Sequence, residues 1–580
     1  MINQRLPYKA IFSIIALSVA WHVDAQSQNS AARQSQLDVV RQQQLLQQQQ
    51  QQSQANMLDK SNFNFKIQRT EKTAVKKGID DLEFLINAVE VDGLSAFIKV
   101  ETDEFFAKFI GKKSTLAEIN EAVEELENQY RQEGYFLSKV YIPAQKIDSG
   151  VLKVTVIEGY INKINVEGGS TTMQEMVKSR MKKILDKKPL DLHTVESELL
   201  VLNAFPGYAV STVLRQGTEL GASEMFVKIT ELDDLYTASV SNFNNGSTGP
   251  WSLILSGTVH RVGGRDNQVT LSLTNSIGMD SISDFKKTIT ASAKYAEPIG
   301  SSGLVGSVSV LQSVSKPLGS LESLSLDTNL QTISPRLTYP LYRGHGNAVS
   351  LDNGVTLSRM TTSSSNALLN FDKEMVYDIN FNWINNVYLG GFNTFNIGFF
   401  KGLPGANSLD PNSSTATTVG FNPLFTKITY NWLRIQPITR TVSLQVTSNG
   451  QYTNDNLLTS DQLVFGGQII GRGYDSATIA GDKGAGVGVE LRKETLYKAP
   501  YLASPIQLFT FWDYGTVTVN NNVTSGVSEH SSALRSYGVG VRTAYPKGSL
   551  ELQYAVSDIS ITSSDPKPNP RVLFYWNYLF

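Results

Sequence analysis

The sequence predicts a transmembrane β-barrel of sixteen antiparallel strands preceded by two small α+β modules. Three observations lead to this fold class. From about residue 233 to the end, apolar and polar residues alternate in short stretches that are separated by turns rich in Gly, Asn, Ser and Asp. Between residues 82 and 232 one order of strands and helices occurs twice. The chain then ends on a strand dense in aromatic side chains.

The composition excludes several classes of function. The chain has 580 residues, with 44 Gly, 19 Pro and no Cys, so it holds neither a disulfide scaffold nor a thiolate metal site. Its 51 basic and 53 acidic residues leave no broad basic field, and we expect no nucleic-acid partner. The five His are far apart and lack a zinc spacing such as His-Glu-x-x-His, so we expect no enzyme, no metal site and no cofactor.

Residues 1–25 have the pattern of a secretory signal peptide. Arg5 and Lys9 give a positive start, residues 10–20 form a short apolar run, and Val23-Asp24-Ala25 supplies small residues where cleavage would occur. An N-terminal membrane anchor is the alternative, but the run is shorter than the roughly 20 residues that span a bilayer. Because the sequence has no later apolar stretch of that length, an exported chain would cross a membrane as a closed barrel.

Residues 26–60 are dominated by glutamine, and two interpretations stay open. Such a segment cannot bury a core of its own, which favours a disordered tail. The alternative is that the segment forms a helix inside a polar, water-filled barrel and acts as a plug, since glutamine on all faces suits a polar lumen. The basic residues of 61–81 predict a solvated linker to the first module.

The first module is predicted over residues 82–160 and the second over 161–232. The first has a strand at 82–91, a helix at 103–110, a helix that begins with the capping box Thr115 to Glu118, and strands at 137–142 and 151–157. The second has a strand at 161–166, helices at 173–185 and 192–203, and strands at 208–215 and 224–229.

The barrel is predicted over residues 233–580. Its strand-like stretches lie near 235–243, 251–261, 267–275, 286–296, 303–313, 330–342, 347–359, 374–388, 391–401, 424–436, 440–452, 485–496, 505–519, 535–545, 549–559 and 571–580. An even number of strands is typical of a bacterial outer-membrane barrel. A soluble β-sandwich also alternates, but it does not usually run to so many strands.

The last predicted strand has the clearest faces. One face carries a lipid-facing row, and the other carries Asn577. The row consists of Val572, Phe574, Trp576, Tyr578 and Phe580.

The sequence Gly471-Arg472-Gly473-Tyr474 lies in a long segment between two predicted strands. Glycine lets neighbouring backbone approach closely and adopts positive φ, while a guanidinium is flat and permanently charged. The combination is suited to pressing an arginine into a confined space, and an ordinary exposed loop arginine is the alternative. The nearby run Gly484-x-Gly486-x-Gly488 is better explained by small inward residues on a strand than by phosphate binding.

With these motifs the chain resembles the outer-membrane transporters of two-partner secretion, the TpsB proteins of ShlB/FhaC/HecB type, over nearly the whole mature chain. That family's arginine motif usually reads Val-Arg-Gly-Tyr, and Gly471 stands here at the valine position. The family's Phe-x-Asp-x-Gly motif is matched by Phe511-Trp512-Asp513-Tyr514-Gly515. Its signatures for two periplasmic POTRA modules resemble Gly134-Tyr135, Ile142-Pro143-Ala144-Gln145, Gly150, Glu158-Gly159 and Leu202-Asn203-Ala204-Phe205-Pro206-Gly207.

The resemblance implies site residues. In such transporters the sixth extracellular loop folds back into the barrel, where its arginine meets an acidic residue of the wall, so these roles fall to Arg472 and Asp513. Alternation agrees with an inward Asp513, because Trp512 and Tyr514 would then face lipid. The loop motif is Gly471, Arg472, Gly473 and Tyr474, and the wall motif includes Asp513 and Gly515. Substrate capture is expected at Gly134, Tyr135, Pro143, Gln145, Gly150, Gly159, Pro206 and Gly207, and the barrel-assembly machinery would read Trp576, Tyr578 and Phe580.

The function that the resemblance implies is export. A monomer in outer-membrane lipid, with its modules in the periplasm, would secrete a large exoprotein of haemolysin or adhesin type that carries an N-terminal secretion domain. No Walker motif is present, so folding of the substrate outside the cell is the expected driving bias. Edge strands at 137–142 and 208–215 would capture the unfolded chain. The alternatives are a barrel-assembly factor, which usually has more modules, and a passive porin, which would have none.

Overall fold

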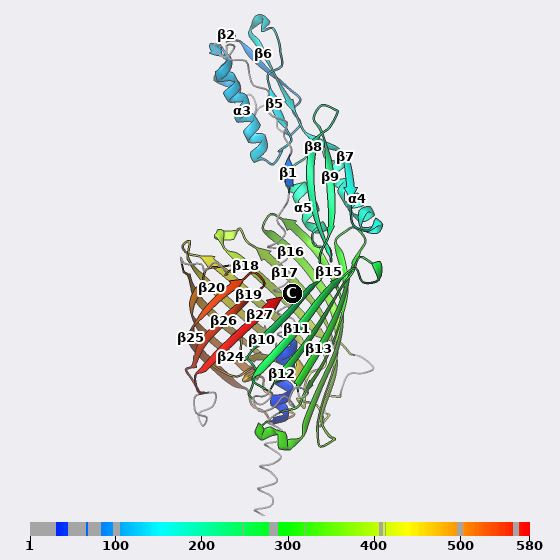
Figure 1. Ribbon diagram of the computed structural model, residues 1–580, viewed down its shortest axis with the longest axis vertical. Coiled ribbons are helices and arrows are strands. Elements are labelled where there is room, and N and C mark those ends of the chain that lie inside the picture. Colours follow the sequence, from blue (N-terminus) through cyan, green and yellow to red (C-terminus); the bar gives the residue numbers. More distant parts are fainter. Residues whose placement is uncertain are drawn as a thin grey trace, which may run out of the picture.

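The structure is a computed structural model that describes residues 31–44, 65–67, 83–96, 105–246, 249–277, 288–317, 319–404, 410–411, 413–495, 502, 504–560 and 568–580. Two α+β modules stand on one rim of a closed barrel, and the first lies farther from the barrel than the second (Figure 1). In these segments no helix is both long and apolar enough to cross a membrane. The predicted signal peptide lies outside the described residues.

The first module packs one long helix on small sheets. Helix α3 (Leu116–Gln132) begins at the predicted capping box, in which Thr115 and Glu118 each accept a backbone N–H of the other. Its buried stripe joins the core against strand β6. The strands are β2 (Glu83–Ile86), β3 (Ala88–Asp92), β4 (Lys112–Thr115), β5 (Lys139–Tyr141) and β6 (Val151–Ile157), in two sheets ordered β2-β4 and β3-β6-β5.

The second module packs two helices on a single four-stranded sheet. It contains β7 (Tyr160–Glu167), α4 (Thr171–Leu185), α5 (Leu192–Leu202), β8 (Tyr208–Gln216) and β9 (Ala222–Glu231). The sheet order is β1-β8-β9-β7, because β1 (Phe65–Ile67) pairs in parallel with residues 212–214 of β8. The segment predicted as a solvated linker therefore contains a short strand. The unpaired backbone groups of the β8 edge are the physical reason, since such an edge binds any extended chain within reach.

Sixteen strands among the described residues close into an antiparallel barrel, which confirms the predicted fold class. The last strand pairs with the first to complete the cylinder. The strands are β10 (Leu235–Ser241), β11 (Trp251–His260), β12 (Gln268–Ile277), β13 (Thr288–Ile299), β14 (Leu304–Ser315), β15 (Leu326–Gly344), β16 (Asn347–Ser364), β17 (Ala367–Asn385), β18 (Phe392–Gly402), β19 (Thr426–Pro437), β20 (Val442–Tyr452), β23 (Lys483–Glu494), β24 (Gln507–Val519), β25 (His530–Tyr545), β26 (Gly548–Ser557) and β27 (Arg571–Leu579).

Each predicted barrel stretch overlaps one observed strand. The predicted and observed strand ends differ most in the long strands. Strand β17 has 19 residues and begins at Ala367, whereas the alternation predicted a start at 374. A membrane needs only about 9–11 residues of a tilted strand. Beyond the bilayer both faces meet water, so the alternating pattern that marks a strand in the sequence fades there.

The faces of the last strand follow the prediction. Val572 and Phe580 are 61% and 66% exposed on the outside, and Leu573 between them is buried. The rings of Trp576, Tyr578 and Phe580 form a continuous row, with neighbouring centroids 6.1 and 5.0 Å apart. Aromatic rows of this kind suit the membrane interface, where one end of a ring is apolar and the other wet.

The second module is fixed to successive turns of the rim that carries it, which we call the module rim. Asp266, in the turn after β11, accepts hydrogen bonds from Tyr208 and from Ser170 at the start of α4. Arg180 of α4 donates to the Ser301 carbonyl in the turn after β13, over 3.0 Å. Helix α5 also packs on β15. The module is therefore held along one arc of the rim.

Residues 31–44 form a helix inside the barrel (Figure 1, blue). Ser35 hydrogen-bonds to Thr328 of β15, and Gln36 donates to Thr362 of β16 and Asn370 of β17, each over 3.0 Å. On its other side Leu37 packs against Val464 and Ala477 of the long loop after β20. Of the two interpretations of residues 26–60, the described part agrees with a helix in a polar lumen.

Candidate functional site

The segment 453–482 folds from the rim opposite the modules, the far rim, back into the barrel. It contains the one-turn helix η6 (Thr459–Asp461) and a hairpin of β21 (Leu463–Phe465) and β22 (Ile479–Gly481). The loop motif lies between the hairpin strands, and its residues are buried against the wall formed by β23, β24 and β25. The long loop, as we call residues 453–482, therefore occupies part of the lumen.

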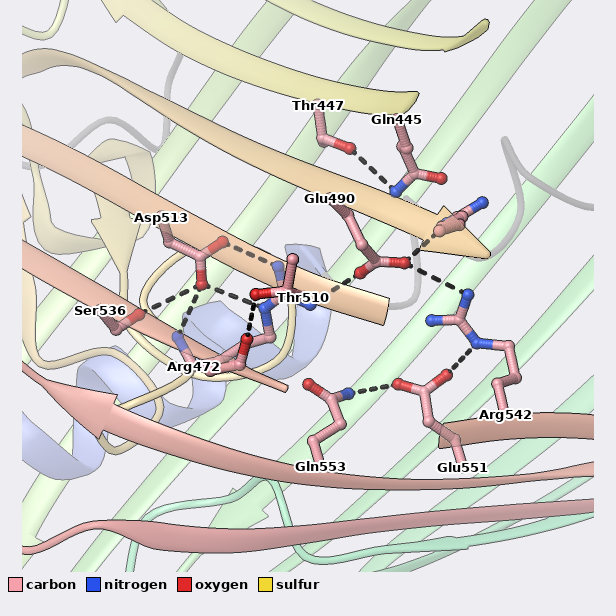
Figure 2. A network of polar contacts seen from close by, with 12 residues as sticks. Gln445, Thr447, Arg472, Glu490, Thr510, Asp513, Ser536, Arg542, Glu551 and Gln553 are labelled. Carbon is pink, nitrogen blue, oxygen red and sulfur yellow. Dashed lines mark hydrogen bonds and ion pairs between the residues drawn. The ribbon is translucent and has the colours of Figure 1, made fainter. Parts of the chain in front are cut away.

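Arg472 and Asp513 meet at this wall (Figure 2). The arginine donates to both oxygens of the carboxylate, from Nη2 to Oδ1 over 2.9 Å and from Nε to Oδ2 over 3.0 Å. Asp513 is 0% exposed and Arg472 is 6% exposed. The guanidinium carbon also lies 3.5 Å from the centroid of the Phe511 ring, a cation–π geometry. A planar fork on a carboxylate fixes direction as well as distance.

Asp513 is satisfied from three further directions. The backbone N–H groups of Gly471 and Arg472 donate to Oδ2 over 3.3 and 3.2 Å, and Ser536 Oγ donates to the same oxygen over 3.2 Å. The neighbours Trp512 and Tyr514 are 42% and 37% exposed on the outside of the barrel. The inward direction of Asp513, predicted from alternation, agrees with this arrangement.

A second wall carboxylate, Glu490 of β23, takes the remaining arm of the arginine. Arg472 Nη1 donates to Glu490 Oε2 over 2.9 Å. The other oxygen of Glu490 accepts from Arg492 Nε at 2.6 Å and from Arg542 Nη1 at 3.3 Å. Arg542 also pairs with Glu551 of β26 (Figure 2). Positive and negative charges thus alternate along the wall, and we call Arg472, Asp513 and Glu490 the arginine network.

The residues around Arg472 explain why glycine flanks it. Gly471 has φ +92°, and a Cβ there would lie 2.7 Å from Leu534, so the valine usual in the family would not fit this backbone. A Cβ at Gly473 would lie 2.7 Å from the backbone of Ser557. Tyr474 is fully buried, and its hydroxyl lies within hydrogen-bond distance of two acceptors for its one proton, the carbonyls of Arg535 and Ile559, at 3.0 and 2.7 Å.

Glycines of the wall make room for the long loop. A Cβ at Gly486 of β23 would lie 2.6 Å from the Phe465 ring, and one at Gly515 of β24 would lie 3.0 Å from the same ring. At Gly488 it would lie 3.0 Å from Asp513 Oδ1. The interpretation of the Gly484-x-Gly486-x-Gly488 run as small inward residues is therefore confirmed at Gly486 and Gly488.

The module motifs lie at turns and joints. The Gly134 carbonyl accepts from Leu192 N over 2.9 Å, and the Gly159 carbonyl accepts from Leu190 N over 3.0 Å, so both glycines join the first module to the second. Gly207, with φ +79°, lies at the joint to the barrel, where a Cβ would be 3.2 Å from His260.

Three of the other motif residues, Gln145, Gly150 and Tyr135, make contacts within the first module. Gln145 bridges to both backbone groups of Lys153. Gly150 forms the turn against Asn87, and Tyr135 packs edge-on against Tyr130. Pro143 and Pro206 are half-buried. That the module motif residues take part in substrate capture stays a prediction.

Glu158, beside Gly159, caps a turn of the first module. It accepts the backbone N–H groups of Ser95 and Ala96 over 2.7 and 2.8 Å, the Ser95 hydroxyl, and the Tyr130 hydroxyl over 3.0 Å. Burial alone raises the pKa of this carboxyl, but the hydrogen bonds outweigh burial and hold the pKa below its ordinary value.

Glu158→Gln is expected to remove a pH dependence from the first module. A carboxyl whose pKa is lowered in the folded state adds stability above its ordinary pKa of about 4.3, and this stability is lost as the pH falls below that value. Glutamine has no such titration and leaves the module less stable by about 1 kcal/mol near neutral pH. Hydrogen exchange of the α3 amides from pH 7 down to about pH 2.5 measures both effects, because the stabilisation by Glu158 is lost only below about pH 4.3. Parallel pH profiles for the variant and the unchanged chain would contradict the assignment.

Two features of the site were absent from the sequence expectations. Glu490 has the same parity on β23 as Gly486 and Gly488, so an inward position could have been read from the alternation. The contacts of the glutamine-rich helix with the long loop had no local signal, because they join residues far apart in the chain.

Comparisons with known proteins place these features in a family context. Residues 230–543 match the haemolysin secretion/activation proteins ShlB/FhaC/HecB, and residues 84–159 match a POTRA domain of ShlB type. The heme/hemopexin transporter protein HuxB of Haemophilus influenzae is 22% identical over 490 residues, which cover 80% of this chain and 83% of HuxB.

Relatives of a second kind are similar in sequence and in fold. The outer membrane transporter CdiB of Escherichia coli is 24% identical over 437 residues, covering 73% of this chain and 71% of that protein. The solved structure of CdiB from Escherichia coli superposes with a TM-score of 0.69 at 20% identity, covering 94% of this chain and 98% of CdiB.

Proposed function

This chain belongs to the haemolysin secretion/activation family of ShlB, FhaC and HecB, and we propose that it exports one large exoprotein, unfolded, through its barrel. As a member of this family it is an outer-membrane transporter of partner proteins and not an enzyme. Its POTRA modules identify the module rim as the periplasmic end and the far rim as the extracellular end.

The observation that carries the proposal is the long loop, whose Arg472 binds Asp513 and Glu490 inside the closed barrel. A buried ion pair adds little net stability, but breaking it by removing one partner is costly. Such a pair fixes the position of a loop without making the fold depend on it. We therefore assign the arginine network the role of holding the loop at the wall between rounds of transport.

The substrate is an exoprotein of haemolysin or adhesin type with an N-terminal secretion domain. The family match and the presence of two modules favour this class over a barrel-assembly factor or a passive porin. We infer that the chain acts as a monomer. The aromatic row at Trp576, Tyr578 and Phe580 is the segment that the barrel-assembly machinery would read during insertion.

Capture begins at strand edges of the modules, where an extended chain can add by backbone hydrogen bonds. Strand β5 lies at the end of its sheet, and its Val140 N–H donates to Glu127 of α3, over 3.4 Å, instead of to β6. The edge of β8 is bordered by β1 at residues 212–214, so a substrate that binds there has to displace β1 or pair beside it.

Proline substitutions test capture at these edges. Val140→Pro and Thr212→Pro each remove an N–H that does not serve the pairing of β5 with β6 or of β8 with β9, and we expect the double variant to lower secretion about tenfold, which corresponds to a loss of about 1.4 kcal/mol. The measurement is exoprotein in the culture medium, with the exoprotein taken from the neighbouring open reading frame.

A control substitution separates capture from folding. The matched control is Val140→Ala with Thr212→Ala, which shortens the same two side chains but keeps both backbone N–H groups. Hydrogen exchange of α3 checks that the double variant keeps its modules folded. Intact secretion by a folded double variant would remove the edges from the mechanism.

A further inference from the structure

The long loop is anchored to the wall at a second place, near its start. Asp461 ends η6, and the Lys427 ammonium of β19 donates to Asp461 Oδ1 over 2.7 Å and to the Asp461 carbonyl over 2.8 Å. The two side chains are only 8% and 11% exposed. The rings of Phe400 and Phe425 lie 5.4 and 5.6 Å from the ammonium. A wall cation is thus enclosed by apolar rings and paired with a loop carboxylate.

A second wall carboxyl joins the same cluster. Ser460, next to Asp461, donates from Oγ to Glu374 Oε1 of β17 over 2.7 Å. Ser358 of β16 donates to the same oxygen over 2.9 Å. The loop is therefore bound to β17 and β19 through two adjacent residues, whereas the arginine network binds β23 and β24.

Residues 413–425, between β18 and β19, pack against this anchor. Leu458, one residue before η6, is 2% exposed and packs against Ala416 and Phe421. The Thr459 N–H donates to Thr417 Oγ1 over 3.1 Å. Thr417 in turn donates to both oxygens of Asp372 on β17, over 2.9 Å from its backbone and 2.6 Å from its hydroxyl.

We propose that Lys427, Asp461 and Glu374, the base latch, are positioning residues for transport: they hold the start of the long loop so that its tip presents Arg472 to Asp513. The inference rests on the proposed role of the loop in export. A latch of this chemistry opens reversibly, because the cost of burying the two charges is about as large as their attraction, and water in an opened lumen would hydrate both again.

The absence of cysteine from the chain makes the latch measurable. A single Leu458→Cys is then the one thiol of the protein, and its reaction with a thiol reagent added outside intact cells reports whether the start of the loop is covered. With Lys427→Met in this background we expect labelling about tenfold faster, because a buried carboxylate left without its cation drives the segment toward water. Secretion should fall together with the faster labelling.

Two controls separate the latch from general destabilisation. Lys401→Met removes an exposed lysine of the neighbouring strand β18, whose ammonium bonds only to Leu424 and Thr426 among described residues, and it should leave labelling and secretion unchanged. Lys427→Arg keeps the cation and should restore slow labelling and most of the secretion. A purely apolar packing role at this position would not be rescued in this way.

The outcomes are distinguishable from failure of the proposed function. If Arg472→Ala stops secretion while Lys427→Met matches Lys401→Met in labelling and secretion, the base latch is wrong and the function stands. If Arg472→Ala secretes normally, the role of the loop itself is wrong. Fast labelling and weak secretion in Lys427→Met, restored by Lys427→Arg, support the latch.

Discussion

Replacing Arg472 with alanine is expected to abolish secretion while the barrel stays folded in the membrane. The substitution leaves Asp513 fully buried without its guanidinium, whereas Glu490 keeps Arg492 and Arg542. Stranding a buried carboxylate in this way costs about 3–5 kcal/mol. The loop tip that carries residue 472 can move, whereas the wall cannot. We therefore expect the tip to leave its position at the wall, and the barrel to stay folded.

Secretion of the exoprotein and the amount of heat-resistant barrel in outer membranes are the two measurements. The order of effects is also expected: Asp513→Asn should approach Arg472→Ala, and Glu490→Gln should be milder, because Glu490 makes one of the three side-chain hydrogen bonds to Arg472. Arg535→Ala is the matched control, since that side chain pairs with Asp558. Normal export by Arg472→Ala would contradict the proposed lock.

Deleting residues 26–60 is expected to raise the ion conductance of the purified barrel several-fold in planar bilayers. The helix 31–44 is packed between the wall and the long loop, through Val39 against Leu330 and Met360 on one side and Leu37 against Val464 on the other. Barrels of sixteen strands leave an aqueous channel unless something fills it. Removal of the helix therefore opens a path for ions and removes one support of the loop.

A full-length variant shows whether the helix 31–44, and not the segment that follows it, limits the ion conductance. Leu37→Asp with Val39→Asp places two charges in the apolar contacts and should displace the helix, which would give the high conductance of the deletion. Deletion of residues 50–60 alone keeps the helix and serves as the control. Equal conductance of the unchanged chain and the 26–60 deletion would show that the helix does not limit ion flow.

The sequence predicted elements whose signal is local and periodic. The alternation of apolar and polar residues predicted the barrel strands and the inward direction of Asp513, and the capping box predicted the start of α3. Successive residues of a strand point to opposite faces, so the environment of each face leaves a periodic pattern in the sequence. Strand ends were predicted less well at β17, where the wall extends beyond the lipid that creates the pattern.

The parts that could not be predicted are contacts between distant segments. Strand β1 pairs with β8 because the open edge of β8 lies close to it, and residues 65–67 carry no sequence pattern that predicts this pairing. In the base latch, Asp461 reaches Lys427 only because the long loop folds back into the barrel. No sequence motif around either residue predicts this ion pair. Glu490 lay within reach of sequence reasoning, since an inward acid on a barrel wall requires a partner.

The helix 31–44 and the long loop, two described segments that lie inside the barrel, are part of the same polypeptide as the wall. Their return after displacement is therefore a unimolecular event, governed by a high effective concentration that the tether sets and not by the abundance of any other protein. Resealing should then be fast and independent of how many transporters a cell makes, so that each passage leaves the permeability barrier of the envelope restored without outside help.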